Sequence, residues 1–148
     1  MELQYSYKPE EETKIAKAIG VGNNISFKKS VMVCDNIRGM NLIDAIALLE
    51  KVKALEKPLP FRRFQRGAAH RTGIGMGKYP KKASTEMLEV LNNAMANAEF
   101  KGLNTEKLKI IFVQANRGMS RRRRKPQGRW KAWKTVLVNY QVIVQETQ

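Results

Sequence analysis

One stretch near the C-terminus, residues 117–134, constrains the fold of this chain more than any other. It carries nine basic side chains and no acidic one, and it lies between two segments with the composition of β-strands. Residues 108–113 are rich in β-branched and aromatic side chains, and in residues 136–144 valine or tyrosine occupies every second position. Pro126 and Gly128 suit a hairpin turn, because proline fixes one backbone dihedral and glycine accepts a positive φ. We therefore predict an extended, basic β-hairpin arm over residues 114–136.

Such an arm would not hold its shape alone. A two-stranded ribbon is only marginally stable in water, and this one would place the basic residues 121–125 opposite those at 129, 131 and 134. With its turn near Pro126, the arm would run about ten residues beyond Gln114, or roughly 35 Å. We infer that it needs an anionic partner. The alternative, a disordered basic tail, is disfavoured because the strand pattern resumes at Thr135.

The charge of the whole chain also points to a polyanionic partner. Its 148 residues suffice for one domain with an extension, and they carry a net charge of +15, with a pI of about 10.2. Residues 1–50 hold six basic and seven acidic side chains, whereas residues 51–105 hold eleven and four and residues 106–148 hold eleven and two. The basic surface should therefore come from the middle and the end of the chain.

Several classes of function are disfavoured. Cys34 is the single cysteine and His70 the single histidine, so neither an internal disulfide nor a zinc site is expected. No carboxylate pair or nucleophile with a base is visible, so we expect no enzyme, no cofactor and no metal. No apolar run approaches the length of a membrane span, and the acidic residues 10–12 do not resemble a targeting signal, which favours a cytoplasmic location.

Three helices are predicted between the strands. Ser26 is a candidate N-cap for a helix that stops at Gly39, and Asn41, with Asp44 in a short capping box, begins a second that ends before Pro58. The third helix, residues 82–100, has the clearest apolar periodicity. The pattern leaves residues 13–19 open between a strand and a helical turn. The apolar stripes expected to be buried are Val31, Cys34 and Ile37; Leu42, Ala45, Ile46, Leu48 and Leu49; and Met87, Val90, Leu91, Ala94, Met95 and Ala98.

Residues 57–82 are predicted to form a long basic loop. They contain eight Lys or Arg and no carboxylate, which favours binding, whereas Phe61 and Phe64 are interpreted as anchors of the loop on the core. The glycines of residues 73–78 do not match the spacing of a phosphate-binding loop, because Thr72 and Tyr79 stand at required positions. A mobile glycine loop is the remaining interpretation. His70 is expected to make a stacking or hydrogen-bonding contact.

Trp130 and Trp133 lie three residues apart, so on one strand they would point to opposite faces. One could stack on a nucleic-acid base while the other packs across the ribbon near Met119. The sequence does not say which does which.

Three further motifs resemble one family. They are the residues Ile25-Ser-Phe-Lys-Lys-Ser with Asn36-Ile-Arg-Gly39, then Asp44-Ala-Ile-Ala-Leu-Leu49, and then Asn93-Ala-Met-Ala-Asn-Ala-Glu99, followed by a strand and a basic hairpin. In this order they resemble the universal large-ribosomal-subunit protein family numbered twenty-two, in its archaeal and eukaryotic-like form. Two departures from the bacterial pattern are Phe27, where proline is common, and a longer basic loop.

The resemblance implies an α+β fold with a small three-stranded antiparallel sheet packed against three helices, and a first strand near residues 15–24. It implies a single domain, residues 1–148, that is a structural constituent of the large subunit and binds its RNA, with neighbouring ribosomal proteins and the nascent polypeptide as further partners. The arm would reach the wall of the exit tunnel with its tip, residues Arg121, Arg122, Arg123, Arg124, Lys125, Pro126, Gln127, Gly128 and Arg129. The residues assigned to contact with ribosomal RNA are Lys28, Lys29, Arg38, Arg62, Arg63, Arg66, His70, Arg71, Lys78, Lys81, Lys82, Arg117, Arg121, Arg122, Arg123, Arg124, Lys125, Arg129, Trp130, Lys131, Trp133 and Lys134.

The competing hypothesis is a DNA-bending architectural protein, whose basic ribbon arms enter the minor groove. Such arms act in pairs from an obligate dimer, which distinguishes the two hypotheses.

Overall fold

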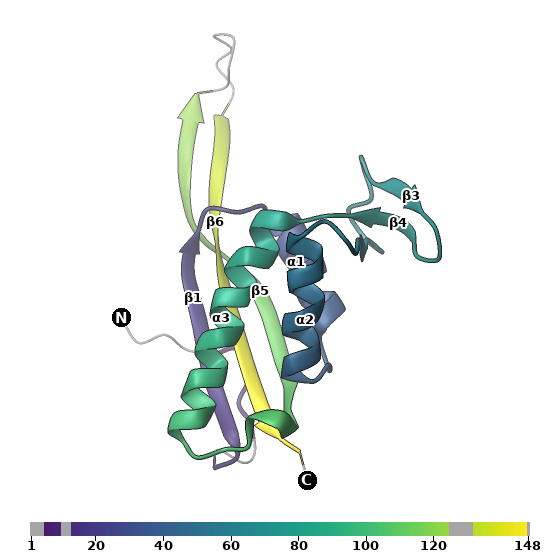
Figure 1. Ribbon diagram of the computed structural model, residues 1–148. Helices are drawn as coiled ribbons and strands as arrows, with labels where there is room; N and C mark the ends of the chain where they lie inside the picture. The colour runs from purple at the N-terminus through teal and green to yellow at the C-terminus, as the bar shows by residue number, and fades with distance from the viewer. Residues whose placement is uncertain (1–4, 10–12, 125–131, 148) are drawn as a thin grey trace.

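Three helices cover one face of a three-stranded antiparallel sheet (Figure 1). The computed structural model describes residues 5–9, 13–124 and 132–147. The strands of this sheet, in spatial order, are β1 (Ile15–Asn23), β6 (Ala132–Glu146) and β5 (Leu108–Arg124). The helices are α1 (Phe27–Ile37), α2 (Leu42–Lys53) and α3 (Lys81–Phe100), and a short 3₁₀ turn, η1 (Thr105–Lys107), precedes β5. The predicted α+β class is confirmed, and residues 15–23 are a strand.

The central strand β6 supplies much of the core. Its alternating residues Val138, Tyr140, Val142 and Val144 are fully buried, as their period-two spacing predicts for a strand with one covered face. Tyr140 is the largest fully buried side chain, and its hydroxyl donates a hydrogen bond of 3.3 Å to the backbone carbonyl of Ala83 at the start of α3. The helical layer is thereby joined to the middle of the sheet.

Two of the helices, α1 and α3, pack directly on the sheet, and α2 packs mainly on α3. α3 lies along β1 and β6, and α1 lies along β5. α3 approaches β1 closely at Gly20, where an added Cβ would lie 2.6 Å from Val90 Cγ2. Among the side chains predicted to be buried, Val31, Ile46, Leu48 and Met95 are only partly buried, because they lie at the edges of the apolar faces.

The predicted capping hydrogen bonds do not form. Ser26 and Asn41 occupy the N-cap positions of α1 and α2, yet neither side chain bonds to the helix backbone. The Asn41 amide donates instead to the carboxylate of Asp44 at 3.2 Å. This contact joins two side chains, so the capping box that was predicted for α2 is wrong in its detail.

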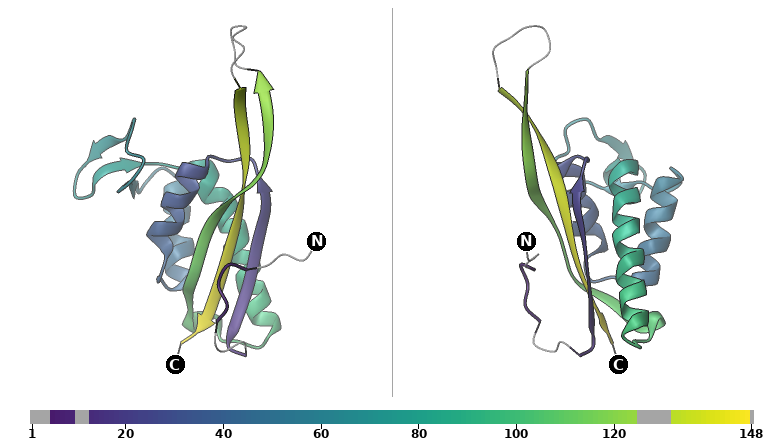
Figure 2. Two further views of the ribbon diagram at one scale, coloured as in Figure 1. Left: turned by 180° about the vertical axis from the view of Figure 1, so that it is seen from behind. Right: turned by 90° about the vertical axis from the view of Figure 1, so that its left-hand side faces the viewer.

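The N-terminal residues 5–9 cross the face of the sheet that the helices leave open (Figure 2). Tyr7 stacks on Phe112 with ring centroids 5.4 Å apart, and the backbone N–H and hydroxyl of Ser6 both donate to the side-chain oxygen of Gln141. These contacts reach β5 and β6. Ile143, which points away from the helices, is consequently fully buried as well.

The predicted basic loop is partly ordered into a second sheet, which corrects the interpretation of residues 57–82 as irregular. β2 (Leu59–Pro60), β4 (Gly75–Lys78) and β3 (Ala69–Arg71) pair in that order, and α3 already begins at Lys81. Of the glycines predicted to form a mobile loop, Gly73 lies in the turn between β3 and β4, and Gly75 and Gly77 lie in β4. A Cβ at Gly77 would lie 2.9 Å from Ile74 Cδ1, so the lack of a side chain allows close packing.

β5 and β6 stay paired with each other beyond the point where β1 ends. The last residue of β1 in register is Asn23, opposite Val138, whereas β5 and β6 stay paired as far as Arg124 and Ala132. The register of β5 shifts between Arg117 and Ser120, as a bulge does where a strand changes direction. The turn predicted at Pro126 and Gly128 lies outside the described residues, so the full arm of residues 114–136 stays a prediction.

Candidate nucleic-acid interface

The described side chains that the sequence assigned to nucleic-acid contact all reach the surface. Lys78 is partly buried and the others are exposed. They come from the first turn and the end of α1, from the connection between β2 and β3, from β3 and β4, from the first turn of α3, and from β5 and β6. The residues assigned to RNA contact that lie outside the described residues are Lys125, Arg129, Trp130 and Lys131, and those assigned only to the tunnel-lining tip are Pro126, Gln127 and Gly128.

Four of these cations surround one hollow, which we call the Phe64 pocket. It has a volume of about 260 Å³ and combines the first turn of α1, the connection between β2 and β3, and the end of β4. Its lining residues are Ser26, Lys28, Lys29, Phe61, Phe64, Arg66 and Lys78. The start of α1 therefore meets segments more than 30 residues later in the chain, in one basic site that contains aromatic rings.

Lys78 joins β4 to the segment that carries Phe64 and Arg66. Its ammonium group donates to the backbone carbonyls of Phe64 at 3.3 Å and Arg66 at 2.7 Å, and it lies 5.3 Å from the centre of the Phe61 ring. Phe61 is buried, which fits the prediction that it anchors this segment. Phe64 is not such an anchor, because 38% of it is exposed and its ring faces the ammonium of Lys28 at 5.5 Å.

Asp35 holds two of the predicted arginines on the side of α1. Its carboxylate pairs with Arg38 at 3.4 Å and with Arg63 through the other oxygen, and Arg38 also donates to the carbonyl of Val113 on β5. Part of their charge is thus neutralised within the protein. Asp35 was not among the predicted site residues, although its spacing of three from Arg38 on a helix indicates such an ion pair.

Arg117 connects β5 to the start of α1. Its guanidinium carbon lies 4.8 Å from the centre of the Phe27 ring, within the range of a cation–π contact. Phe27 directly precedes Lys28, which lines the Phe64 pocket. The basic end of the globular part and the exit of β5 from the sheet are therefore adjacent. No contact was predicted for Phe27, which the sequence marked only as a departure from the bacterial family pattern.

Beyond β1, the paired strands carry cations on both sides. Arg122 is opposite Lys134, so the predicted placement of like charges across the ribbon is confirmed at this pair. Arg123 is opposite Trp133 and lies 3.5 Å from the hydroxyl of Thr135. Trp133 is 48% exposed and lies opposite Arg123, four positions along β5 from Met119, and the packing of one tryptophan near Met119 stays a prediction.

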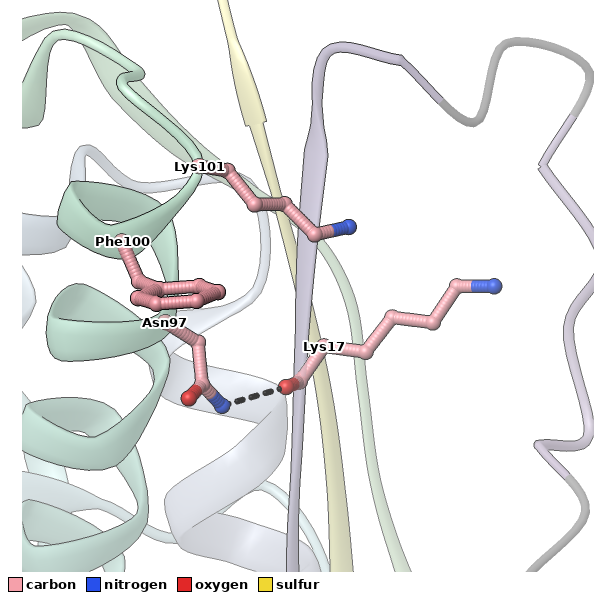
Figure 3. A pocket seen from close by; sticks show the side chains of 4 residues that line it. All are labelled: Lys17, Asn97, Phe100 and Lys101. Carbon is pink, nitrogen blue, oxygen red and sulfur yellow. Dashed lines mark hydrogen bonds between the residues drawn. The ribbon is translucent and has the colours of Figure 1, made fainter.

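A second hollow lies between the C-terminal end of α3 and β1 (Figure 3). The Asn97 amide donates to the carbonyl of Lys17, and the Lys101 ammonium donates to the carbonyl of Ile15, both at 2.9 Å. These contacts tie the end of the helix to β1. Phe100 projects beside them and is 94% exposed, a feature that the sequence pattern did not indicate.

In the part of the chain that the structure describes, reactive side chains do not form a chemical site. Within residues 5–9, 13–124 and 132–147, no three His, Cys, Asp or Glu side chains are placed to share a metal ion. Cys34 is buried, and burial raises the pKa of its thiol far above the usual value, as predicted for an inert core residue. His70 is exposed on β3. None of the helices in the described parts of the chain has the length and apolar character needed to cross a bilayer.

Residues 18–145 match the family of ribosomal proteins L22p/L17e. The chain belongs to this family. It is 46% identical to the large ribosomal subunit protein uL22 of Archaeoglobus fulgidus over 119 residues, which cover 78% of this chain and 77% of that protein. It is 42% identical to the uL22 protein of Methanococcus vannielii over 146 residues and 43% identical to that of Methanosphaera stadtmanae over 147 residues, with at least 95% of each chain covered.

Membership in the L22p/L17e family confirms the resemblance that the three helical motifs indicated. The chain is a structural protein of the large ribosomal subunit and belongs to the cytoplasm, and its family is not enzymatic. The hypothesis of a DNA-bending protein loses its support.

Proposed function

We propose that this protein binds the RNA of the large ribosomal subunit through one basic end and the ribbon that continues from it. The basic end comprises the Phe64 pocket, the arginines around Asp35 and the first turn of α3. The ribbon comprises β5 and β6 beyond Arg117. Guanidinium groups suit this role because their planar fork meets two phosphate oxygens at once, and the same plane stacks on unpaired bases.

The observation that carries the proposal is the composition of the ribbon. From Ser120 to Arg124 and from Ala132 to Val136, the paired strands hold five cations and no carboxylate, and the four arginines and Lys134 are all exposed. Opposed like charges such as Arg122 and Lys134 destabilise a sheet. A sheath of phosphates would remove that repulsion, whereas a solvated ribbon would keep it.

A salt titration tests the RNA contact. The logarithm of the affinity for large-subunit RNA should fall with the logarithm of salt concentration, at about 0.7–0.9 per neutralised phosphate. Replacing Arg121, Arg122, Arg123 and Arg124 together by glutamine should reduce this slope by about three. The matched control replaces Lys107 and Lys109, exposed at the opposite end of β5 from the ribbon, by glutamine and should leave the slope unchanged. Equal slopes for the ribbon variant and wild type would refute the ribbon contact.

We further propose that the tip of the ribbon lines the exit tunnel and meets the nascent polypeptide. This follows from the family resemblance together with the direction in which β5 and β6 leave the sheet (Figure 1). A photoreactive residue at Gln127 in assembled subunits should crosslink to a stalled nascent chain, whereas one at the exposed Ile43 of α2 should not. Crosslinks from both positions, or from neither, would contradict a tunnel location.

A further inference from the structure

We propose that the Phe64 pocket binds one unpaired nucleotide of RNA, with the base stacked on the Phe64 ring and the phosphate held by the cations around it. This proposal rests on the RNA-binding function proposed above and makes it specific to a residue. The assignment of the basic residues to RNA contact required only a charged surface. The pocket adds an aromatic platform, held in a defined place, to that charge.

Phe64 is held in an unusual backbone conformation. Its φ is +56°, in the left-handed region that a bulky L-residue rarely adopts. Lys78 fixes the segment by donating to the carbonyls of Phe64 and Arg66. Strained conformations of this kind persist where the surrounding structure imposes them and are concentrated at ligand sites. Here the strain keeps an aromatic side chain partly exposed at the surface, while neighbouring Phe61 is buried.

The cations are arranged for a phosphate beside the ring. Lys28 lies 5.5 Å from the ring centre of Phe64, and Lys29 and Arg66 line the same hollow. Among the described residues no carboxylate lines this hollow, whereas Asp35 lines the neighbouring hollow that shares the Phe64 ring and is paired there with Arg38 and Arg63. An incoming phosphate would therefore meet several positive charges in this hollow and no carboxylate. Lys28 can exchange its contact with the ring for a contact with phosphate, which leaves the ring to a base.

The size and position of the pocket favour a single nucleotide. Its volume of about 260 Å³ lies just below the range of roughly 300–1,000 Å³ that drug-sized ligands occupy, so it suits one small planar group. The rigid stacked bases of a duplex do not present a free face to a ring, whereas an unpaired base does. The same ring also lines the hollow between α1 and β5, beside the start of the ribbon.

Substitutions of Phe64 separate stacking from charge. Phe64→Ala should lower the affinity for large-subunit RNA by about 5- to 150-fold at a fixed salt concentration, with an unchanged salt slope, because a stacked base is lost and no phosphate contact is lost. Phe64→Tyr should keep the wild-type affinity. Lys28→Ala should instead reduce the salt slope by about 0.7–0.9. The matched control is Phe100→Ala, which removes the far more exposed ring at the other end of α3 and should change neither quantity.

Phe64→Gly distinguishes a binding role from a packing role. Glycine accepts the positive φ without strain, so this variant should keep a Tm within about 3 °C of wild type while losing RNA affinity as Phe64→Ala does. A variant with a lowered Tm and wild-type RNA affinity would overturn the proposal, since Phe64 would then be a packing residue. Wild-type affinity in Phe64→Ala would overturn it too, while a steep salt dependence left the RNA-binding function standing. If the unmodified protein bound no large-subunit RNA, the proposed function itself would fail.

Discussion

Ser30 and Ser84 are fully buried hydroxyl residues that differ in one respect. The hydroxyl of Ser30 donates to the carbonyl of Ser26 at 2.9 Å, whereas that of Ser84, in the first turns of α3, has no hydrogen-bond partner among the described residues. A buried polar group without a partner is destabilising, and a satisfied one is close to neutral or better. The two serines therefore form a matched pair.

We predict that Ser84→Ala raises the free energy of unfolding by about 0.5–2 kcal/mol, since it removes the unpaired hydroxyl and adds helix propensity. Ser30→Ala should not stabilise the protein, because the hydroxyl that it removes has a partner. Urea denaturation of both variants measures this difference. Equal effects of the two substitutions would mean that the surroundings of the two hydroxyls do not differ as the structure shows.

The buried Cys34 and Tyr140 lead to a prediction about alkaline pH. Burial raises the pKa of both groups above their ordinary values of 9.0 and 10.0, so the folded protein keeps them neutral where the unfolded chain ionises. Their contribution to stability is complete below those values and is lost as pH rises through them, at up to about 1.4 kcal/mol per pH unit and group. Cys34→Ala should therefore show a shallower loss of stability between pH 9 and 10 than wild type, by denaturation under reducing conditions. Parallel pH profiles would contradict this.

At the scale of elements, the contact between β1 and α3 depends on one missing side chain. Gly20 does not have a positive φ, so its role is to allow close approach and not to accept an unusual conformation. The facing atom, Val90 Cγ2, belongs to the buried side of α3 and has little space in which to move. Close packing of this kind makes a single added methyl group destabilising.

We predict that Gly20→Ala lowers the free energy of unfolding by about 1–3 kcal/mol. Adding Val90→Ala to the Gly20→Ala variant should recover part of the lost free energy of unfolding, because the Cγ2 atom that the new Cβ meets is then absent. Chemical denaturation of both single variants and of the double variant gives the coupling energy. If the effects of the two substitutions on the free energy of unfolding were additive, the two side chains would not be in steric conflict.

The sequence predicted those elements whose side chains repeat over many residues. The buried alternation of β6 and the apolar face of α3 are examples, because each repeat reports the same covered surface. The small sheet of β2, β4 and β3 escaped prediction, since its strands are two to four residues long and β4 alternates glycine with larger side chains. The Phe64 pocket was equally out of reach, because it depends on long-range contacts such as that of Lys78 with Phe64 and on a positive φ at a residue that rarely adopts one.

At the scale of the whole molecule, the two faces and two ends of the sheet have different tasks. Helices cover one face and the N-terminal segment crosses the other (Figures 1 and 2). The start of α1, the small sheet and the start of α3, which carry many of the predicted RNA-contact residues, lie at the end from which β5 and β6 leave (Figure 1). Phe100 is the last residue of α3, so it lies at the opposite end of that helix from the basic residues of its first turn. The protein is thus expected to enter RNA with its ribbon first and with the Phe64 pocket beside it.

Directed cleavage of RNA from a probe on the ribbon tests this orientation most directly. Cys34 is the single native cysteine and is buried, so an iron chelate can be attached selectively to a cysteine introduced at Ser120 on β5 or, as a control, at Ala47 on α2, both exposed. In assembled large subunits, hydroxyl radicals from position 120 should cut large-subunit RNA strongly at clustered sites, and those from position 47 should cut it weakly. Cleavage from position 120 that is absent or no stronger than from position 47 would contradict a ribbon embedded in RNA.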